Sequence, residues 1–107
     1  MDTITPAALA RRLGDSDPPA LLDVREHEEH AFCALPGSRL IPLGELGIRA
    51  DELADWQDRE VVVYCHHGIR SAHAVGLLHR LGFAHVLNLA GGVDRWTRDV
   101  DPSFPRY

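Results

Sequence analysis

The feature that most constrains the fold of this 107-residue chain is a run of four apolar residues, followed by a cysteine and then by a helix. The run Val61–Tyr64 lacks polar alternation, which is typical of a strand buried on both faces of a parallel sheet. Cys65 follows directly, and then a turn from His66 to Arg70. Residues 71–81 predict a helix with a broad apolar face, and Gly82 fits its C-cap. This order places a thiol at the positive end of a helix.

Shorter segments of the same kinds fill the rest of the chain. Strands are predicted over residues 20–24, 39–42 and 86–89, and Pro42 favours an edge position or a strand end for the second of these. Helices are predicted from Thr5-Pro6 to Gly14 and over residues 25–32, 44–58 and 93–96. Gly76, inside the longest helix, predicts close packing of that helix on the sheet.

The alternation of strands and helices predicts one α/β domain over residues 1–107. We expect a mostly parallel central sheet of about five short strands flanked by helices. In such sheets, functional sites lie beyond the carboxyl ends of the strands. Three loops follow predicted strand ends, namely Asp23-Val24-Arg25, Cys65 to Arg70 and Ala90-Gly91-Gly92. If the strands are parallel, these loops lie at one edge of the sheet.

The composition excludes several functions. The net charge is −5, and all eleven basic residues are arginines. The negative charge argues against nonspecific nucleic-acid binding, and the absence of lysine excludes a lysine nucleophile or Schiff base. No secretory signal and no apolar run of about 18 residues is visible, so we expect a cytoplasmic monomer that does not enter membranes. In that compartment, Cys33 and Cys65 are expected to be free thiols.

Cys65 has the surroundings of a reactive cysteine. A thiolate is the nucleophilic form of cysteine, and the free thiol has a pKa near 8.5. The unpaired amides of the helix start and the Arg70 guanidinium favour that form. The amides of the turn can curl around the sulfur as an anion nest, for which Gly68 permits the backbone geometry. The alternative is a buried cysteine at a strand end with no chemical role.

Four segments of the chain resemble the rhodanese-like family of sulfurtransferases. They are Leu22-Asp23-Val24-Arg25, Leu35-Pro36-Gly37-Ser38 with Ile41-Pro42, the six-residue loop from Cys65 to Arg70, and Gly91-Gly92-Val93-Asp94-Arg95-Trp96. The family usually has His-Ile where Ala34-Leu35 stand. The four segments occur in the family's order at compatible spacing, and the resemblance covers nearly the whole chain.

The resemblance implies a thiosulfate sulfurtransferase-like enzyme without cofactor or metal. Cys65 would take the outer sulfur from thiosulfate, a polysulfide or a persulfide and pass it to a thiol, a protein or cyanide. The implied substrate-binding loop consists of His66, His67, Gly68, Ile69 and Arg70. Arg70 would add positive charge and hold the loop, and Ser71 would cap the following helix.

The roles of the residues around the loop are less defined. Some family members carry Arg or Lys in place of His66 and His67, whereas histidines are largely neutral near pH 7, which disfavours thiosulfate. Alternatively, both histidines are solvent-exposed residues without a chemical role. Asp23 and Arg25 are expected to pair with neighbouring groups and brace the site. Cys33 is expected to be a small buried residue, and the alternative is a thiol that resolves an oxidised Cys65.

Four other functions compete with sulfur transfer. Cysteine phosphatases place five residues between the cysteine and the arginine of a similar loop, whereas four separate Cys65 from Arg70, which leaves little room for phosphate. Arsenate reduction on a six-residue loop stays open. Zinc binding by Cys65, His66, His67 and His73 lacks a second ligand pair. A noncatalytic docking module is the main rival of a different class, and an intact Cys65 argues against it.

Overall fold

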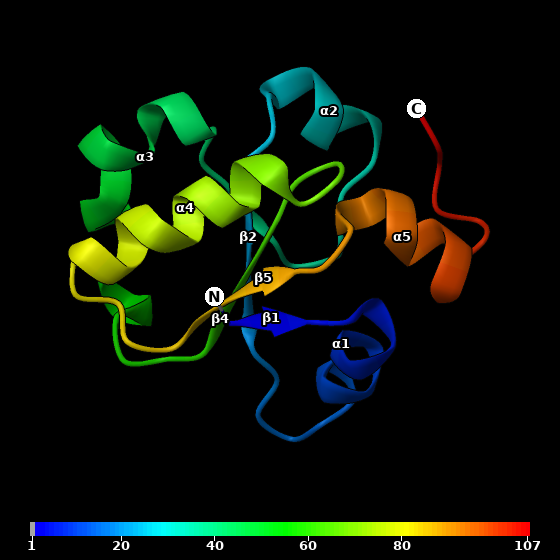
Figure 1. The fold of residues 1–107 in the computed structure, drawn as a ribbon, viewed down its shortest axis with the longest axis horizontal. Coiled ribbons are helices and arrows are strands. Elements are labelled where there is room, and N and C mark those ends of the chain that lie inside the picture. The colour runs from blue at the N-terminus through cyan, green and yellow to red at the C-terminus, as the bar shows by residue number, and fades with distance from the viewer. Residues whose placement is uncertain (1) are drawn as a thin grey trace.

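The computed structural model describes residues 2–107 and confirms the predicted α/β architecture (Figure 1). Its sheet contains β1 (Thr3–Ile4), β2 (Ala20–Asp23), β3 (Arg39–Leu40), β4 (Val61–Tyr64) and β5 (Val86–Leu89). The strands lie in the order β1-β5-β4-β2-β3, and every neighbouring pair is parallel. The central strand is β4, as its apolar sequence predicts, and β3 lies at an edge, as Pro42 predicts.

Helices cover both faces of this sheet. They are α1 (Pro6–Leu13), α2 (His27–Phe32), α3 (Leu43–Arg49), the 3-10 helix η1 (Ala50–Trp56), α4 (Ile69–Arg80) and α5 (Gly92–Asp99). In Figure 1, α3 and α4 lie on one side of the strands, and α1 and α5 on the other. Among residues 2–107, no helix has both the length and the apolar character needed to cross a membrane.

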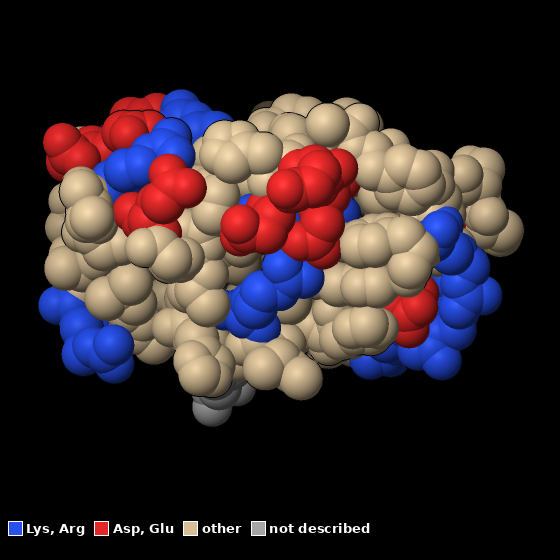
Figure 2. Space-filling view, turned by 90° about the horizontal axis from the view of Figure 1, so that it is seen from above, with Lys and Arg blue, Asp and Glu red and all other residues tan. Residues whose placement is uncertain are grey.

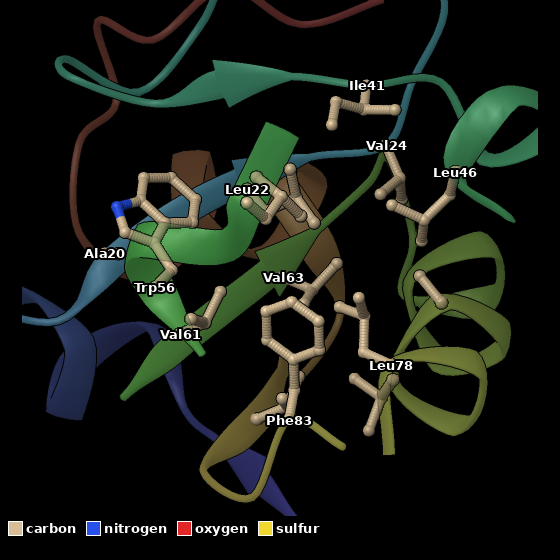
Figure 3. Close-up of a cluster of buried hydrophobic side chains, with 14 of the residues drawn as sticks. Ala20, Leu22, Val24, Ile41, Leu46, Trp56, Val61, Val63, Leu78 and Phe83 are labelled. Atoms are coloured by element: carbon tan, nitrogen blue, oxygen red, sulfur yellow. The ribbon is translucent and has the colours of Figure 1, made fainter. Parts of the chain in front are cut away.

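The alternation of β4 side chains builds two apolar clusters. Val61 and Val63 pack with residues of α3, η1 and α4, and Figure 3 shows this cluster around Leu78 and Trp56. Val62 and Tyr64 belong to the cluster formed with α1 and α5. Successive residues of a strand point to opposite faces of the sheet. All side chains of a continuously apolar strand are therefore buried only when helices cover both faces.

The longest helix, α4, differs from its prediction at the start, the middle and the end. It begins at Ile69, two residues earlier than predicted. Gly76 is half-buried, and a Cβ atom there would meet only the Arg80 guanidinium at 3.8 Å, so the predicted close packing of Gly76 on the sheet is wrong. The helix ends at Arg80 with Leu81 as its C-cap, one residue earlier than predicted, and Gly82 follows with φ of 95°. The N–H of Gly82 donates to the His79 carbonyl and that of Phe83 to the Leu78 carbonyl.

Two peripheral segments carry more structure than the sequence suggests. The strand β1 is only two residues long and pairs with β5, which a propensity-based prediction over longer windows misses. The tail over residues 101–107 contains no helix or strand, as predicted, yet Phe104 is buried in the cluster under α5. The tail is therefore packed against the domain rather than extended away from it.

The strand register brings the predicted loops together. Asp23 at the end of β2 pairs with Tyr64 at the end of β4, and Val63 pairs with Asn88 in β5. The carboxyl ends of three adjacent strands therefore coincide. As predicted, the loops after Asp23, Tyr64 and Leu89 share one edge of the sheet.

Candidate active site

The Cys65 sulfur accepts hydrogen bonds from two backbone amides at the start of α4. The backbone N–H groups of Gly68 and Ser71 donate to Cys65 Sγ at 3.1 and 3.4 Å, and Ser71 Oγ lies 3.3 Å from the same atom. Gly68, the N-cap of α4, has φ of 101°, which L side chains rarely adopt. The predicted anion nest is thus present as geometry, and Cys65 is 1% exposed at its base.

Ser71 does not cap α4, which corrects its predicted role. Gly68 is the N-cap, and Ser71 is the third residue inside the helix, where its side chain is fully buried. Its hydroxyl donates to Asn88 Oδ1 at 2.5 Å, while Asn88 Nδ2 donates to the Gly68 carbonyl at 3.1 Å. The sequence analysis missed Asn88. The signal was one amide in an otherwise apolar strand, Val86-Leu87-Asn88-Leu89.

The start of α5 forms hydrogen bonds to the backbone of the Cys65–Arg70 loop. The N–H groups of Val93 and Asp94 donate to the carbonyls of Cys65 and His66, each at 3.0 Å. Gly92 lies directly under these carbonyls with φ of 60°, and a Cβ atom there would collide with both of them. The closing Gly-Gly segment therefore permits a close backbone approach that fixes the loop.

Arg70 is paired with a carboxylate that the sequence analysis did not select. Its guanidinium donates to both oxygens of Glu29, in α2, at 2.6 and 3.0 Å. These hydrogen bonds hold the pKa of Glu29 at about 2. They also raise the pKa of Arg70, and the Cys65 charge contributes less. Arg70 thus connects the loop to α2, and Glu29 neutralises much of its positive charge.

Asp23 and Arg25 pair with neighbouring groups, as predicted, and form a buried brace. Both side chains are fully buried, and the guanidinium of Arg25 donates to both carboxylate oxygens of Asp23 at 2.8 and 2.9 Å. Burial alone would lower the pKa of Arg25, but hydrogen bonds to Asp23 and Tyr107 raise it above its usual value. The same guanidinium donates to the Cys33 carbonyl and the Tyr107 hydroxyl, so the brace ties β2 to α2 and to the tail.

The two loop histidines are part of an aromatic stack. The ring of His66 lies 3.9 Å from that of His67 on one side and 3.9 Å from that of Tyr107 on the other. Burial, followed by the neighbouring His67, lowers the pKa of His66. Tyr107, which the sequence analysis did not select, also donates its hydroxyl hydrogen to Glu29 at 2.8 Å. Ile69, the fifth residue of the loop, is exposed.

The second cysteine lies away from the loop. Cys33 and Cys65 are both free and buried, as predicted. They belong to the two apolar clusters on opposite faces of the sheet. A disulfide between them would require the site to rearrange, which supports a packing role for Cys33.

One group of side chains has the composition of a metal site. Ligand atoms of His66, His67 and Asp94 lie within 4.8 Å of one another. The two imidazole rings are stacked at 29°, so their in-plane lone pairs run side by side instead of converging, and Asp94 lies 3.5 Å from the Arg106 guanidinium. Among residues 2–107, the alternative zinc set with Cys65 and His73 does not come together as a metal cluster.

Comparison with known proteins gives the class that this fold and loop define. Residues 5–99 match the rhodanese-like domain family, so the chain belongs to that family. A protein named sulfurtransferase from Allochromatium vinosum is 36% identical over 98 residues, which are 92% of this chain and 90% of that protein. The probable adenylyltransferase/sulfurtransferase MoeZ of Mycobacterium tuberculosis is 33% identical, and the match covers 98% of this chain but 27% of MoeZ.

A solved structure of similar size has the same fold. The human single-domain sulfurtransferase TSTD1 superimposes with a TM-score of 0.80 at 28% identity, and the match covers 92% of this chain and 97% of TSTD1. The predicted family and fold class are therefore confirmed.

Proposed function

We propose that this chain is a sulfurtransferase that carries one sulfur atom on Cys65 as a persulfide. One observation carries the proposal: the backbone amides of Gly68 and Ser71 both donate to Cys65 Sγ at the start of α4. Donors fixed around a buried sulfur stabilise negative charge there without having to reorganise. Sulfurtransferase-named relatives support the same reaction class.

The proposed cycle has two displacement steps. The Cys65 thiolate attacks the outer sulfur of the donor, and the S–S bond of the donor breaks. The leaving group departs with the electron pair, as sulfite from thiosulfate or as a thiolate from an organic persulfide. A thiolate of the acceptor then attacks the terminal sulfur of the Cys65 persulfide, which restores the Cys65 thiolate. No net oxidant or reductant is needed.

The loop residues divide the work. The amides of the nest stabilise the bound sulfur, and Gly68 supplies the backbone conformation that aims them. Arg70 holds the loop against α2 through Glu29. Arg25 contacts Tyr107 in the tail and the Cys33 carbonyl after α2, and Asp23 contacts Arg25 and His30. Neither is hydrogen-bonded to the Cys65 sulfur, so they act as positioning residues.

The acceptor is proposed to be a thiol, either small or carried by a protein. A protein acceptor is supported by relatives whose names include a putative sulfur carrier protein, YrkF of Bacillus subtilis, and MoeZ. No step requires a metal or an organic cofactor.

A transfer experiment tests the proposal against the docking-module alternative. The chain is incubated with a sulfur donor, separated from it, and mixed with an excess of a low-molecular-weight thiol. The proposal predicts that sulfur appears on the thiol in a single turnover and that Cys65→Ser transfers none. A chain that binds no sulfur from thiosulfate, polysulfide or an organic persulfide would favour a docking role. Cys65-dependent turnover of an aryl phosphate would favour phosphatase chemistry.

A further inference from the structure

The surface beside the Cys65 loop is aromatic. The rings of His67, His66 and Tyr107 stack in that order, and the Tyr107 ring meets the Phe32 ring edge-on at 5.9 Å. Phe32 is 58% exposed and Tyr107 is 44% exposed, which is unusual for side chains of this size. With Glu28 and Glu29 they line an open hollow of about 270 Å³. An apolar group brought to this surface would find partners there.

The cations around the loop are already paired. Arg70 pairs with Glu29, Arg25 with Asp23, and Arg106 with Asp94. Figure 2, which views the molecule from the side of α2 and the loop, shows acidic side chains at the centre of this face next to basic ones, not a continuous basic surface. A small dianion approaching the loop would therefore gain little electrostatic attraction.

Stacking and burial disfavour a positive charge on His66. His66 is stacked between two rings, and the groups that face it are His67, Tyr107, Asp94, Glu29 and Arg70. Burial and the neighbouring His67 lower its pKa, although Asp94 and Glu29 oppose the shift. The entrance is therefore weakly charged and aromatic at the pH where the enzyme would work.

From this entrance we infer that the sulfur donor is an organic persulfide, R–S–SH, and that Tyr107 sets this preference over the thiosulfate dianion. The inference rests on the proposed function. Cys65 would form a bond to the outer sulfur of R–S–SH, and R–S⁻ would leave with the electron pair of the broken S–S bond. The group R contacts Tyr107 and Phe32, where carbon and sulfur both pack favourably against aromatic rings.

A matched pair of charge variants tests the electrostatic part. His67→Arg places a new cation at the loop, whereas His79→Arg makes the same change in the last turn of α4, at the far end of a 12-residue helix. Loading of Cys65 is followed by quenched intact-mass measurement with thiosulfate and with benzyl persulfide. We expect His67→Arg to speed thiosulfate loading about tenfold, as one charge several ångströms from a dianion would, and to speed benzyl persulfide loading clearly less. Equal thiosulfate rates in the two variants would overturn the inference.

Two variants at residue 107 test the aromatic part. Tyr107→Leu removes the ring and should slow benzyl persulfide loading about three- to tenfold without slowing thiosulfate. Tyr107→Phe keeps the ring and removes the hydroxyl that contacts Glu29, and it should load benzyl persulfide within about twofold of the parent chain. Equal losses with both donors in Tyr107→Leu, or no loss with either, would show that Tyr107 does not select the donor.

The same assay separates this inference from the proposed function and identifies the carrier. If no donor loads the unsubstituted chain, the proposed function fails. If donors load but the variants do not change their ratio, only the donor preference fails.

A persulfidated single-cysteine protein is compared with benzyl persulfide in the charge-variant experiment. The inference requires His67→Arg to speed thiosulfate loading more than loading by either organic donor. The faster of the two organic donors indicates whether a protein or a small molecule carries R.

Discussion

Ser71 donates its hydroxyl hydrogen to Asn88 Oδ1 across 2.5 Å while its oxygen lies 3.3 Å from Cys65 Sγ. The Asn88 amide is itself oriented by its hydrogen bond to the Gly68 carbonyl. Asn88 in β5 therefore positions two groups: the Ser71 hydroxyl beside the Cys65 sulfur, and the turn at Gly68, whose amide donates to that sulfur. This chain of contacts explains why a polar residue stands in the otherwise apolar strand β5.

Removing the Ser71 hydroxyl should slow the chemistry of Cys65 without unfolding the chain. Ser71→Ala keeps the backbone N–H that donates to the sulfur but removes the hydroxyl that holds Asn88, and Asn88 orients the turn whose Gly68 amide donates to Cys65. We therefore expect alkylation of Cys65 by iodoacetamide to slow about three- to tenfold. Asn88→Leu should have a similar effect, and the double variant should lose less than the product of the two. Ser103→Ala, at an exposed tail position, is the control. Independent, multiplicative effects would contradict the shared role.

The Glu29–Arg70 pair should make stability depend on pH in the acid range. The folded-state pKa of Glu29 is about 2, below its ordinary 4.5, so its contribution is fully present above about pH 4.5 and is lost as the pH falls toward 2. After allowance for solvent screening we expect about 1–2 kcal/mol. Urea unfolding at pH 5 and pH 3 should show a smaller pH effect for Glu29→Gln than for the exposed control Glu28→Gln. Identical pH effects would argue against the pairing.

The buried brace should matter for stability and not for the chemical step. Arg25→Met leaves the Asp23 carboxylate buried with only part of its partners, which should lower the free energy of unfolding by about 3–5 kcal/mol. Adding Asp23→Asn should recover part of that loss, and the exposed Arg59→Met should change little. Urea unfolding gives the values. If folded Arg25→Met, kept at low temperature, no longer accepts sulfur, Arg25 takes part in the chemistry and the structural role is wrong.

Gly76 in α4 and Gly92 at the start of α5 should respond to substitution by alanine in opposite ways. Gly76→Ala should raise the free energy of unfolding by up to about 1 kcal/mol, because its Cβ atom meets no crowded neighbour and alanine favours the helix. Gly92→Ala should be strongly destabilising, because the Cβ atom would collide with the loop carbonyls and φ is positive. Thermal unfolding of the two variants checks both. A destabilised Gly76→Ala would show that the packing at this position is tighter than the structure indicates.

The parts of the site that the sequence reveals are those built from contiguous residues. The strand Val61–Tyr64, the cysteine and the glycine turn are local, and their periodicity and turn chemistry suffice to predict a nest at a helix start. Local patterns do not identify Glu29 and Tyr107, because Glu29 contacts Arg70 41 positions away and Tyr107 contacts Arg25 82 positions away. A charged residue on a short polar helix looks like an ordinary surface residue until the fold shows what faces it.

The donor preference illustrates the same limit. The sequence predicts neutral histidines at the loop but gives Arg70 a free charge. In the structure the Arg70 charge is not free, because Arg70 forms a salt bridge with Glu29. The ring of Tyr107 also stacks on that of His66. Which charges remain unpaired is a property of the tertiary arrangement, so local pattern alone did not reveal it.

The central claim is that Cys65 holds a transferable sulfur atom, and intact-mass measurement tests it most directly. After incubation with an organic persulfide and removal of excess donor, the unsubstituted chain should gain the mass of one sulfur atom, which a thiol then removes. Cys33→Ser, the matched control at the other cysteine, should gain the same mass, and Cys65→Ser should gain none. An adduct that persists in Cys65→Ser, or no adduct on the unsubstituted chain with any sulfur donor, would contradict the account.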